Sequence, residues 1–196
     1  MRRVAIFASG AGSNAQKIIE HFAQSAEIEI ALIVCNKPEA GVLQIAINNQ
    51  IPTLLIEKEP FFRGNAYVDE LKFFNIDFIV LAGFLWKVPS LLIHSFLGKI
   101  VNIHPALLPK YGGKGMYGSF VHQAVINNKE TESGITIHFV DEEYDHGSVI
   151  FQARCDVEEQ DRPESLAAKI HLLEHAHYPK IIETVLLKQQ YSNTMD

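Results

Sequence analysis

The sequence is poor in cysteine, in long apolar runs and in positive charge. Its two cysteines, Cys35 and Cys155, form no Cys-x-x-Cys motif, so we expect reduced thiols and a cytoplasmic protein rather than a disulfide-rich secreted one. The longest apolar run, residues 78–86, is well short of the about 20 residues that a membrane helix needs. No signal-peptide cleavage pattern follows Met1. We therefore expect no association with membranes.

Acidic residues outnumber basic ones. The chain has 17 Lys and Arg against 23 Asp and Glu, and its net charge of −6 argues against nucleic acid as a partner, because phosphate-tracking surfaces are usually basic. Small anionic substrates remain compatible with this charge, since local donors are enough to hold them. With 196 residues, 47% of them hydrophobic, and neither repeats nor linkers, the sequence predicts one domain, residues 1–196, with a substantial core.

Short apolar segments alternate with amphipathic segments in the first half of the chain. This alternation predicts a parallel sheet with helices on both faces. The strand at residues 78–82 is the most apolar and is expected at the centre of the sheet. We expect the other strands at residues 4–8, 28–34, 52–56 and 99–103, and helices at residues 15–26, 41–49, 61–74 and 88–96.

The pattern changes after Gly118. A helix at residues 119–127 is followed by strands at residues 134–140 and 148–156. The turn between these strands is too short for a crossover helix, so the pair is expected to be antiparallel. A final helix starts at a capping box of Asp161 and Glu164 and runs to about Lys188. The predicted fold class is α/β: a Rossmann-like, mixed but mostly parallel sheet with helices on both faces and an antiparallel C-terminal strand pair.

The strand that ends in Asn102-Ile103-His104-Pro105 carries two candidate catalytic residues. Residues two apart in a strand point to the same face, so the Asn102 amide and the His104 imidazole should project together at the rim of the sheet. Pro105 favours extended geometry at His104. An amide donor beside a titratable donor suits an oxygen that gains negative charge in a reaction. The alternative is a strand end with a solvated histidine.

A glycine-rich turn, Ser9-Gly10-Ala11-Gly12-Ser13-Asn14, separates the first strand from the first helix. Glycines allow backbone N–H groups to approach an anion, and the helix N-terminus adds a partial positive charge, so we expect a phosphate site. The turn also fits a Gly-x-Gly-x-x-Ala dinucleotide motif, but no acidic residue follows the second strand. A tight turn without a ligand is the other alternative.

The acidic turn at residues 141–145 lies between the two C-terminal strands, and its default interpretation is a solvated hairpin tip. If this turn lies beside the carboxyl edge of the sheet, one carboxylate can stand near His104 and stabilise its imidazolium form. Asp145 is the best candidate, because the glycine after His146 permits a tight turn around it. No Ser or Cys occupies a nucleophile elbow. The sequence therefore predicts direct attack of a substrate nucleophile on a carbonyl group.

Two further motifs are weaker. His171-Leu172-Leu173-Glu174-His175 matches the His-x-x-Glu-His pattern of some zinc peptidases, but only 21 residues remain after His175, among them Glu183 and no further strand, so we expect no metal. Residues 112–118 contain a Gly-x-Gly-x-x-Gly pattern that follows a proline-containing loop rather than a strand. We interpret these residues as a mobile connector near the site, and the alternative is that Lys114 reaches a ligand phosphate.

Together, these segments resemble the phosphoribosylglycinamide formyltransferases, folate-dependent enzymes of purine synthesis. The resemblance rests on residues 9–14, 81–84, 102–105 with 107–109, and 134–139 with Asp145 and Gly147, and on Glu174-His175-Ala176-His177-Tyr178-Pro179, in the family's order. It implies residues 1–103 as a Rossmann-like half that binds the nucleotide phosphate, residues 104–190 as the catalytic and folate-binding half, and residues 191–196 as a polar tail. This sequence departs from the family's usual residues at 85–88 and at His146, and its 112–118 segment is longer than in better-known members.

The resemblance implies that the amine of glycinamide ribonucleotide attacks the formyl carbon of 10-formyltetrahydrofolate, the co-substrate. Asn102 and His104 would stabilise the oxyanion, and Asp145 would assist the movement of the proton. The ribonucleotide would be held by Gly12, Ser13, Asn14, His171 and Glu174. The folate would be held by Asn102 and by Arg63, Leu85, Trp86, Lys87, Val88, Val140, Asp141, Glu142, Glu143, Tyr144 and Asp145. No metal is implied, and the protein would be a monomer or homodimer.

Three other functions stay open. A sugar-amine formyltransferase or a formyltetrahydrofolate hydrolase would use the same formyl chemistry. A non-catalytic module that binds an NADP-type dinucleotide, with Lys37 at the 2′-phosphate, belongs to a different class.

Overall fold

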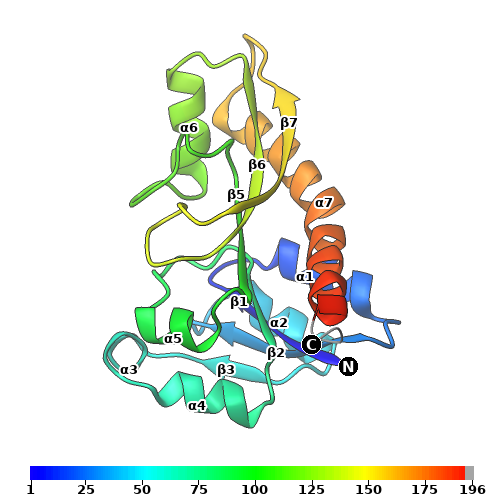
Figure 1. Ribbon diagram of the computed structural model, residues 1–196. Helices are drawn as coiled ribbons and strands as arrows, with labels where there is room; N and C mark the ends of the chain where they lie inside the picture. Colours follow the sequence, from blue (N-terminus) through cyan, green and yellow to red (C-terminus); the bar gives the residue numbers. More distant parts are fainter. Residues whose placement is uncertain (193–196) are drawn as a thin grey trace.

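A twisted sheet of seven strands organises residues 1–192, the part of the chain that the computed structural model describes (Figure 1). In spatial order the sheet runs β3-β2-β1-β4-β5-β6-β7. Neighbouring strands from β3 to β5 are parallel, whereas β6 is antiparallel to both β5 and β7. The strands are β1 Arg2–Ala8, β2 Ile28–Cys35, β3 Thr53–Leu55, β4 Phe78–Leu81, β5 Ile100–His104, β6 Glu132–Phe139 and β7 Val149–Asp156. These findings confirm the predicted fold class and the central place of β4.

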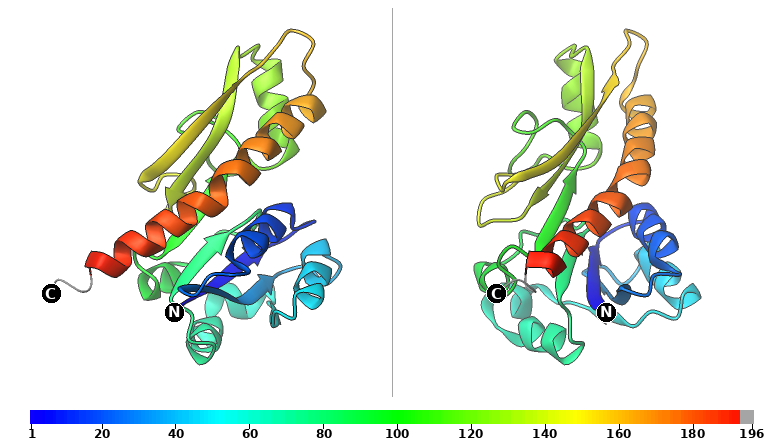
Figure 2. Two further views of the ribbon diagram at one scale, coloured as in Figure 1. Left: turned by 90° about the vertical axis from the view of Figure 1, so that its right-hand side faces the viewer. Right: turned by 45° about the vertical axis from the view of Figure 1, so that its right-hand side comes forward.

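The parallel strands are apolar throughout because both faces of the sheet are covered. In β1, Val4 and Ile6 pack into one buried cluster while Ala5 and Phe7 pack into another on the opposite face. The first cluster is completed by α1 Ser13–Phe22, α2 Gly41–Asn48, α6 Ser119–Asn127 and α7 Pro163–Ser192, and the second by α3 Lys58–Arg63, α4 Ala66–Phe73 and α5 Ser90–Ser95. Figure 2 shows α7 running along the sheet beside β6 and β7.

The predicted single helix at residues 61–74 is wrong. Two helices, α3 and α4, occupy this region, because Gly64 is extended (φ −130°, ψ 176°) and interrupts the helix after Arg63. The first of them starts earlier than expected, at Lys58, because Pro60 falls in its first turn, where a missing N–H is tolerated. The predicted helix at residues 88–96 is shortened to Ser90–Ser95, since Pro89 is extended (φ −67°, ψ 147°).

Both predicted ends of the last helix need correction. Asp161 does not form a capping box with Glu164. Instead, the Ser165 hydroxyl accepts a hydrogen bond from the Arg162 N–H at 2.9 Å and donates to the Asp161 carboxylate at 2.7 Å. The helix continues to Ser192, so the expected tail at residues 191–196 begins inside it, and residues 193–196 lie outside the described range. Within residues 1–192, no helix is long and apolar enough to span a membrane.

Candidate active site

A cavity of about 600 Å³ opens where β1, β4 and β5 end. Parallel strands and right-handed crossovers bring these loops to one edge of the sheet, which is where the sequence predicted a ligand site. The cavity is lined by the turn after β1 (residues 10–14), the segment around the end of β4 (81–88), the end of β5 (102–105), the glycine-rich loop (113–118), parts of residues 138–145, and His122, His171 and Glu174.

Asn102 is held in place by a histidine on the neighbouring strand. In the register of β5 and β6, Asn102 stands opposite His138. The His138 Nδ1 lies 2.8 Å from the Phe139 carbonyl oxygen and must therefore carry a proton, which leaves Nε2 to accept from the Asn102 amide at 3.1 Å. His138 is only 2% exposed, and burial lowers its pKa, which favours the neutral ring. The second N–H of the Asn102 amide remains for a ligand.

His104 and Asp145 lie close to this pair. The His104 Nε2 donates to the Tyr111 carbonyl at 2.7 Å, and its Nδ1 is 3.5 Å from the Asp145 Oδ2. The same carboxylate accepts the Gly113 N–H at 2.9 Å, and its other oxygen is 3.8 Å from the His138 Nε2. The structure thus brings Asn102, His104 and Asp145 together, and the His104 nitrogen left for proton exchange is Nδ1.

Asp145 reaches His104 by a route that the sequence did not predict. Because Phe139 pairs with Val101, and the Val140 N–H donates to the Ile100 carbonyl, β6 ends beside the start of β5 rather than beside its carboxyl end. The loop after β6 therefore folds back across the sheet to place Asp145 near His104. A Cβ at Gly147 would overlap the Phe139 carbonyl, so the return of the loop requires a glycine there.

The predicted phosphate turn lies at the other end of the cavity. Gly12 caps α1 in the left-handed region (φ 84°), and a Cβ there would lie 2.8 Å from the Val42 Cβ. Ser13 and Asn14 begin α1, so their backbone N–H groups belong to the helix end that attracts anions. The Asn14 side chain is already engaged, because its amide donates to the Glu174 carboxylate at 2.8 Å.

Glu174 accepts a second hydrogen bond from α7 itself. The His171 Nδ1 lies 2.9 Å from the same carboxylate oxygen, and this hydrogen bond raises the His171 pKa. One turn further along α7, the buried Tyr178 hydroxyl donates to the Leu81 carbonyl at 2.9 Å and so fixes this helix against the end of β4. Glu174 is only 5% exposed and presents a negative group to the cavity near the phosphate turn.

Residues 2–182 match the formyl transferase family. The chain belongs to this family. It is 34% identical over 191 residues to a phosphoribosylglycinamide formyltransferase of Bacillus subtilis, and the match covers 95% of each chain. A chloroplastic phosphoribosylglycinamide formyltransferase of Arabidopsis thaliana is 40% identical over 190 residues, which are 94% of this chain and 65% of the plant protein. This chain thus spans just under two thirds of that relative.

Solved structures of the family have the same fold. The phosphoribosylglycinamide formyltransferase of Bacillus halodurans superimposes with a TM-score of 0.85 at 36% identity, over 94% of this chain and 95% of that one. A glycinamide ribonucleotide transformylase of Geobacillus kaustophilus gives 0.86 at 33% identity, over 95% and 99% of the two chains. The family resemblance expected from the motifs is therefore confirmed.

Most of the residues expected on the folate side of this formyl transferase line the cavity. The Leu85 N–H donates to the Ser9 hydroxyl at 3.0 Å, which ties the segment after β4 to the end of β1. Phe84 and Trp86 pack against Phe61 in an aromatic cluster beneath the cavity. The predicted residues that line the cavity are Leu85, Trp86, Lys87, Val88, Val140, Asp141, Glu143, Tyr144 and Asp145.

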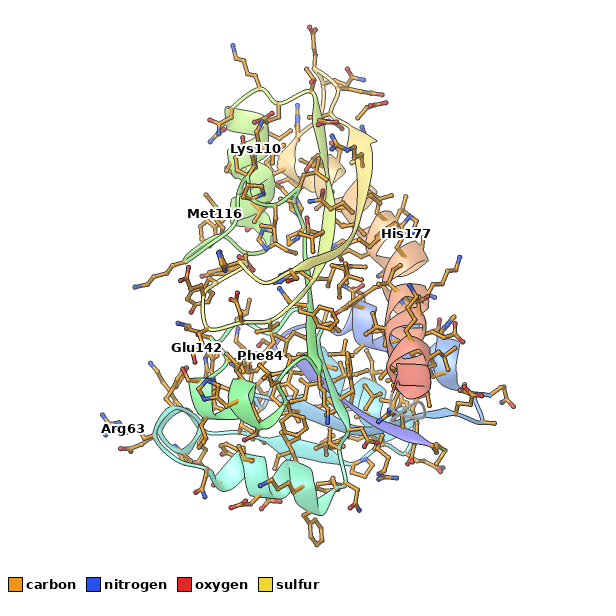
Figure 3. All side chains as sticks on the ribbon, viewed as in Figure 1. Arg63, Phe84, Lys110, Met116, Glu142 and His177 are labelled. Carbon is orange, nitrogen blue, oxygen red and sulfur yellow. The ribbon has the colours of Figure 1, made fainter. Side chains whose placement is uncertain are left out.

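Two predicted folate residues do not line the cavity. Arg63 pairs with Glu59 at 2.9 Å, its side chain is 79% exposed, and Figure 3 shows it pointing away from the body of the protein. Glu142 forms an ion pair with His94 of α5 at 2.7 Å on the surface. Each side chain is engaged by an oppositely charged neighbour, and the assignment of both residues to the folate stays a prediction.

Two buried histidines of the cavity, His122 and His138, were not predicted from the sequence. His138 was detectable in principle, because polar Thr136 and His138 alternate in β6 with apolar residues. His122 lies on α6, and its spacing within the helix gives no comparable signal. It is 4% exposed, burial lowers its pKa, and its Nδ1 has no hydrogen-bond partner within the described residues.

The zinc-peptidase pattern on α7 does not form a metal cluster. Among residues 1–192, no three His, Cys, Asp or Glu side chains are placed to hold a metal ion. The His171 and His175 rings instead stack at 6.1 Å with an interplanar angle of 17°, and Glu174 is bonded to Asn14.

Proposed function

We propose that this chain transfers the formyl group of 10-formyltetrahydrofolate to the amine of glycinamide ribonucleotide, in purine biosynthesis. The observation that carries the proposal is that one cavity contains both an anion-binding turn and the Asn102, His104 and Asp145 group. A substrate with a phosphate at one end and an amine at the other would span these two sites. The names of the related proteins give this substrate its identity.

The ribonucleotide would lie between α1 and α7. Its phosphate would bind at Gly12 and Ser13, where backbone N–H groups and the helix N-terminus favour a negative charge. Asn14 would support this subsite from α1, while its side chain orients Glu174. Glu174, with His171 beside it, would face the amine-bearing end of the substrate, because a carboxylate recognises an ammonium group or an amide N–H.

The folate would occupy the remainder of the cavity. Residues 85–88 and the 140–145 loop offer apolar surface together with backbone polar groups, which suits a flat heteroaromatic ring. The Lys87 ammonium lies 5.5 Å from the centre of the Tyr144 ring, so a cation–π contact joins these two walls. The formyl group would then lie near Asn102.

The chemistry would proceed by direct attack. The substrate amine forms a bond to the formyl carbon, and the carbonyl oxygen becomes an oxyanion that the free Asn102 N–H stabilises, joined by the His104 Nδ1–H once that nitrogen has taken up a proton. The His104 Nδ1, directly or through a water, takes the proton that the substrate nitrogen loses, and the Asp145 carboxylate stabilises the imidazolium that forms. The oxyanion then re-forms the carbonyl, the folate nitrogen leaves with the bonding electrons, and that nitrogen takes up the proton held by His104. No residue forms a covalent intermediate in this scheme.

A formyl-transfer assay tests the proposal. Purified protein should convert glycinamide ribonucleotide and 10-formyltetrahydrofolate to formylglycinamide ribonucleotide and tetrahydrofolate, measured by absorbance and mass spectrometry. Three parallel experiments test the alternatives. Sugar amines replace the acceptor to test for a sugar-amine formyltransferase, the acceptor is left out to test for the hydrolase, and titration with NADP tests for binding by a dinucleotide module. A positive result in one of these three experiments, without formyl transfer to glycinamide ribonucleotide, would overturn the proposal. A cytoplasmic location and a monomeric or homodimeric state remain predictions.

A further inference from the structure

The short turn at residues 111–113 contacts both His104 and Asp145. The carbonyl of Tyr111 accepts the His104 Nε2–H at 2.7 Å, and the N–H of Gly113 donates to the Asp145 carboxylate at 2.9 Å. The first contact selects the tautomer with a proton on Nε2 and thereby directs Nδ1 at Asp145. The second contact holds the carboxylate oxygen that faces this Nδ1. The separation of His104 and Asp145 therefore depends on the position of this turn.

The turn has an unusual backbone. Tyr111 has a φ of 58°, in the left-handed region that residues with a side chain rarely adopt. Such a conformation persists only where surrounding contacts hold it. Two residues after Tyr111, Gly113 also has a positive φ, of 95°. Contacts outside the turn must therefore fix its shape.

Those contacts are made by the side chain of Tyr111. Its hydroxyl donates to the Glu130 carboxylate at 2.8 Å and accepts the Asn128 amide N–H at 2.9 Å. Lys110 donates to both Glu130 oxygens, at 3.0 and 3.1 Å, and Figure 3 shows this lysine beside α6. These hydrogen bonds lower the Glu130 pKa and so maintain the carboxylate as the acceptor. The Tyr111 ring also packs against the core cluster that contains β5 and β6.

We propose that Tyr111 is a positioning residue: its hydroxyl, held by Glu130 and Asn128, fixes the turn whose backbone orients His104 and Asp145. This inference rests on the proposed formyl transfer. Asn128 caps the C-terminus of α6, and Glu130 precedes β6, so the anchor lies outside the cavity and contacts no substrate. The network thus acts on the reaction only through the two catalytic side chains.

Tyr111→Phe tests the proposal, because it removes the hydroxyl and keeps the ring. We expect kcat for formyl transfer to fall about tenfold, which corresponds to about 1.4 kcal/mol, while both KM values change less than about twofold. Glu130→Gln should lower kcat in the same way, and the double variant should be no worse than the poorer single variant, since both changes break one contact. Tyr67→Phe is the matched control: that hydroxyl also accepts one backbone N–H, from Glu57 at 2.8 Å, but its ring packs on the cluster at the opposite face of the sheet.

A second readout separates positioning from stability. In a long-range ¹H–¹⁵N NMR spectrum, His104 of the wild-type protein should be locked with its proton on Nε2, and Tyr111→Phe should show exchange between the two tautomers. If Tyr111→Phe does not fold, Glu130→Gln, whose change is isosteric, carries the same test. Suppose that the wild-type enzyme is active and that the folded variant has the wild-type kcat and the wild-type His104 spectrum. This result refutes the positioning role but not the proposed function. An inactive wild-type enzyme refutes the proposed function instead.

Discussion

Asp145→Asn isolates the charge of the carboxylate from its shape. The replacement has nearly the same volume and retains an oxygen for the Gly113 N–H, but the negative charge next to His104 is lost. Asp145 is 12% exposed, and its Oδ2 lies 3.5 Å from the His104 Nδ1. At an effective dielectric constant of about 20, two unit charges at this distance attract by about 5 kcal/mol. Solvent in the open cavity screens part of this energy, so we expect a loss of about 3–4 kcal/mol in transition-state stabilisation, or about 10²–10³-fold in kcat.

The assay is steady-state formyl transfer at saturating concentrations of both substrates. The KM values should change little, because the lost interaction forms only as the proton moves. Asp77→Asn is the matched control, since the Asp77 carboxylate also accepts a backbone N–H, from Arg3 at 2.8 Å, but lies outside the cavity. A folded Asp145→Asn protein with kcat within about threefold of the wild type would contradict the role of the carboxylate.

Three further predictions concern the other cavity residues. Asn102→Ala and His104→Ala should each lower kcat by about 10²–10³-fold, and near-normal turnover in both would exclude the oxyanion role. Glu174→Gln should raise the KM for glycinamide ribonucleotide more than the KM for the folate, because it removes the anion that Asn14 and His171 orient; equal changes in both would refute this subsite. Burial lowers the pKa of His122 and His138 below the about 6.5 of an unfolded chain, so the unfolded state binds more protons and stability should fall as pH decreases below that value. Urea unfolding between about pH 7.5 and 5.5 measures this dependence, and His138→Gln should reduce it.

The sequence predicted the parallel half of the sheet well because burial on both faces leaves a clear signal. Runs such as Val4-Ala5-Ile6-Phe7-Ala8 are apolar at every position, which few other environments allow. The tight turn after β1 was predictable for a related reason, since Gly12 occupies a position that only glycine fills without strain. Both features are determined by residues that are close together in the sequence, so the sequence alone is enough to predict them.

The failed or missing predictions depend on contacts that are distant in sequence. The break at Gly64 was missed because Tyr67, Leu71 and Phe74 continue the helical spacing beyond it. Arg63 was assigned to the folate by the family resemblance and stays a prediction; its place outside the cavity follows from the direction of α3 and the pairing with Glu59. The approach of Asp145 to His104 was expected from a turn at the carboxyl edge, and it arises from a loop that folds back across the sheet.

The pairing of Asn102 with His138 follows from the burial of their neighbours. Val101 and Ile103 of β5 face the same core cluster as Ile135 and Ile137 of β6, and this shared face excludes a slip of one residue between the strands. Asn102 and His104 must then share the opposite face with Thr136 and His138. A slip of two residues would retain the faces, but it would break the bond from the Val140 N–H to the Ile100 carbonyl and that from the Leu108 N–H to the Thr136 hydroxyl. Apolar burial therefore selects the face on which Asn102 and His104 lie, and these two hydrogen bonds select their partners on β6.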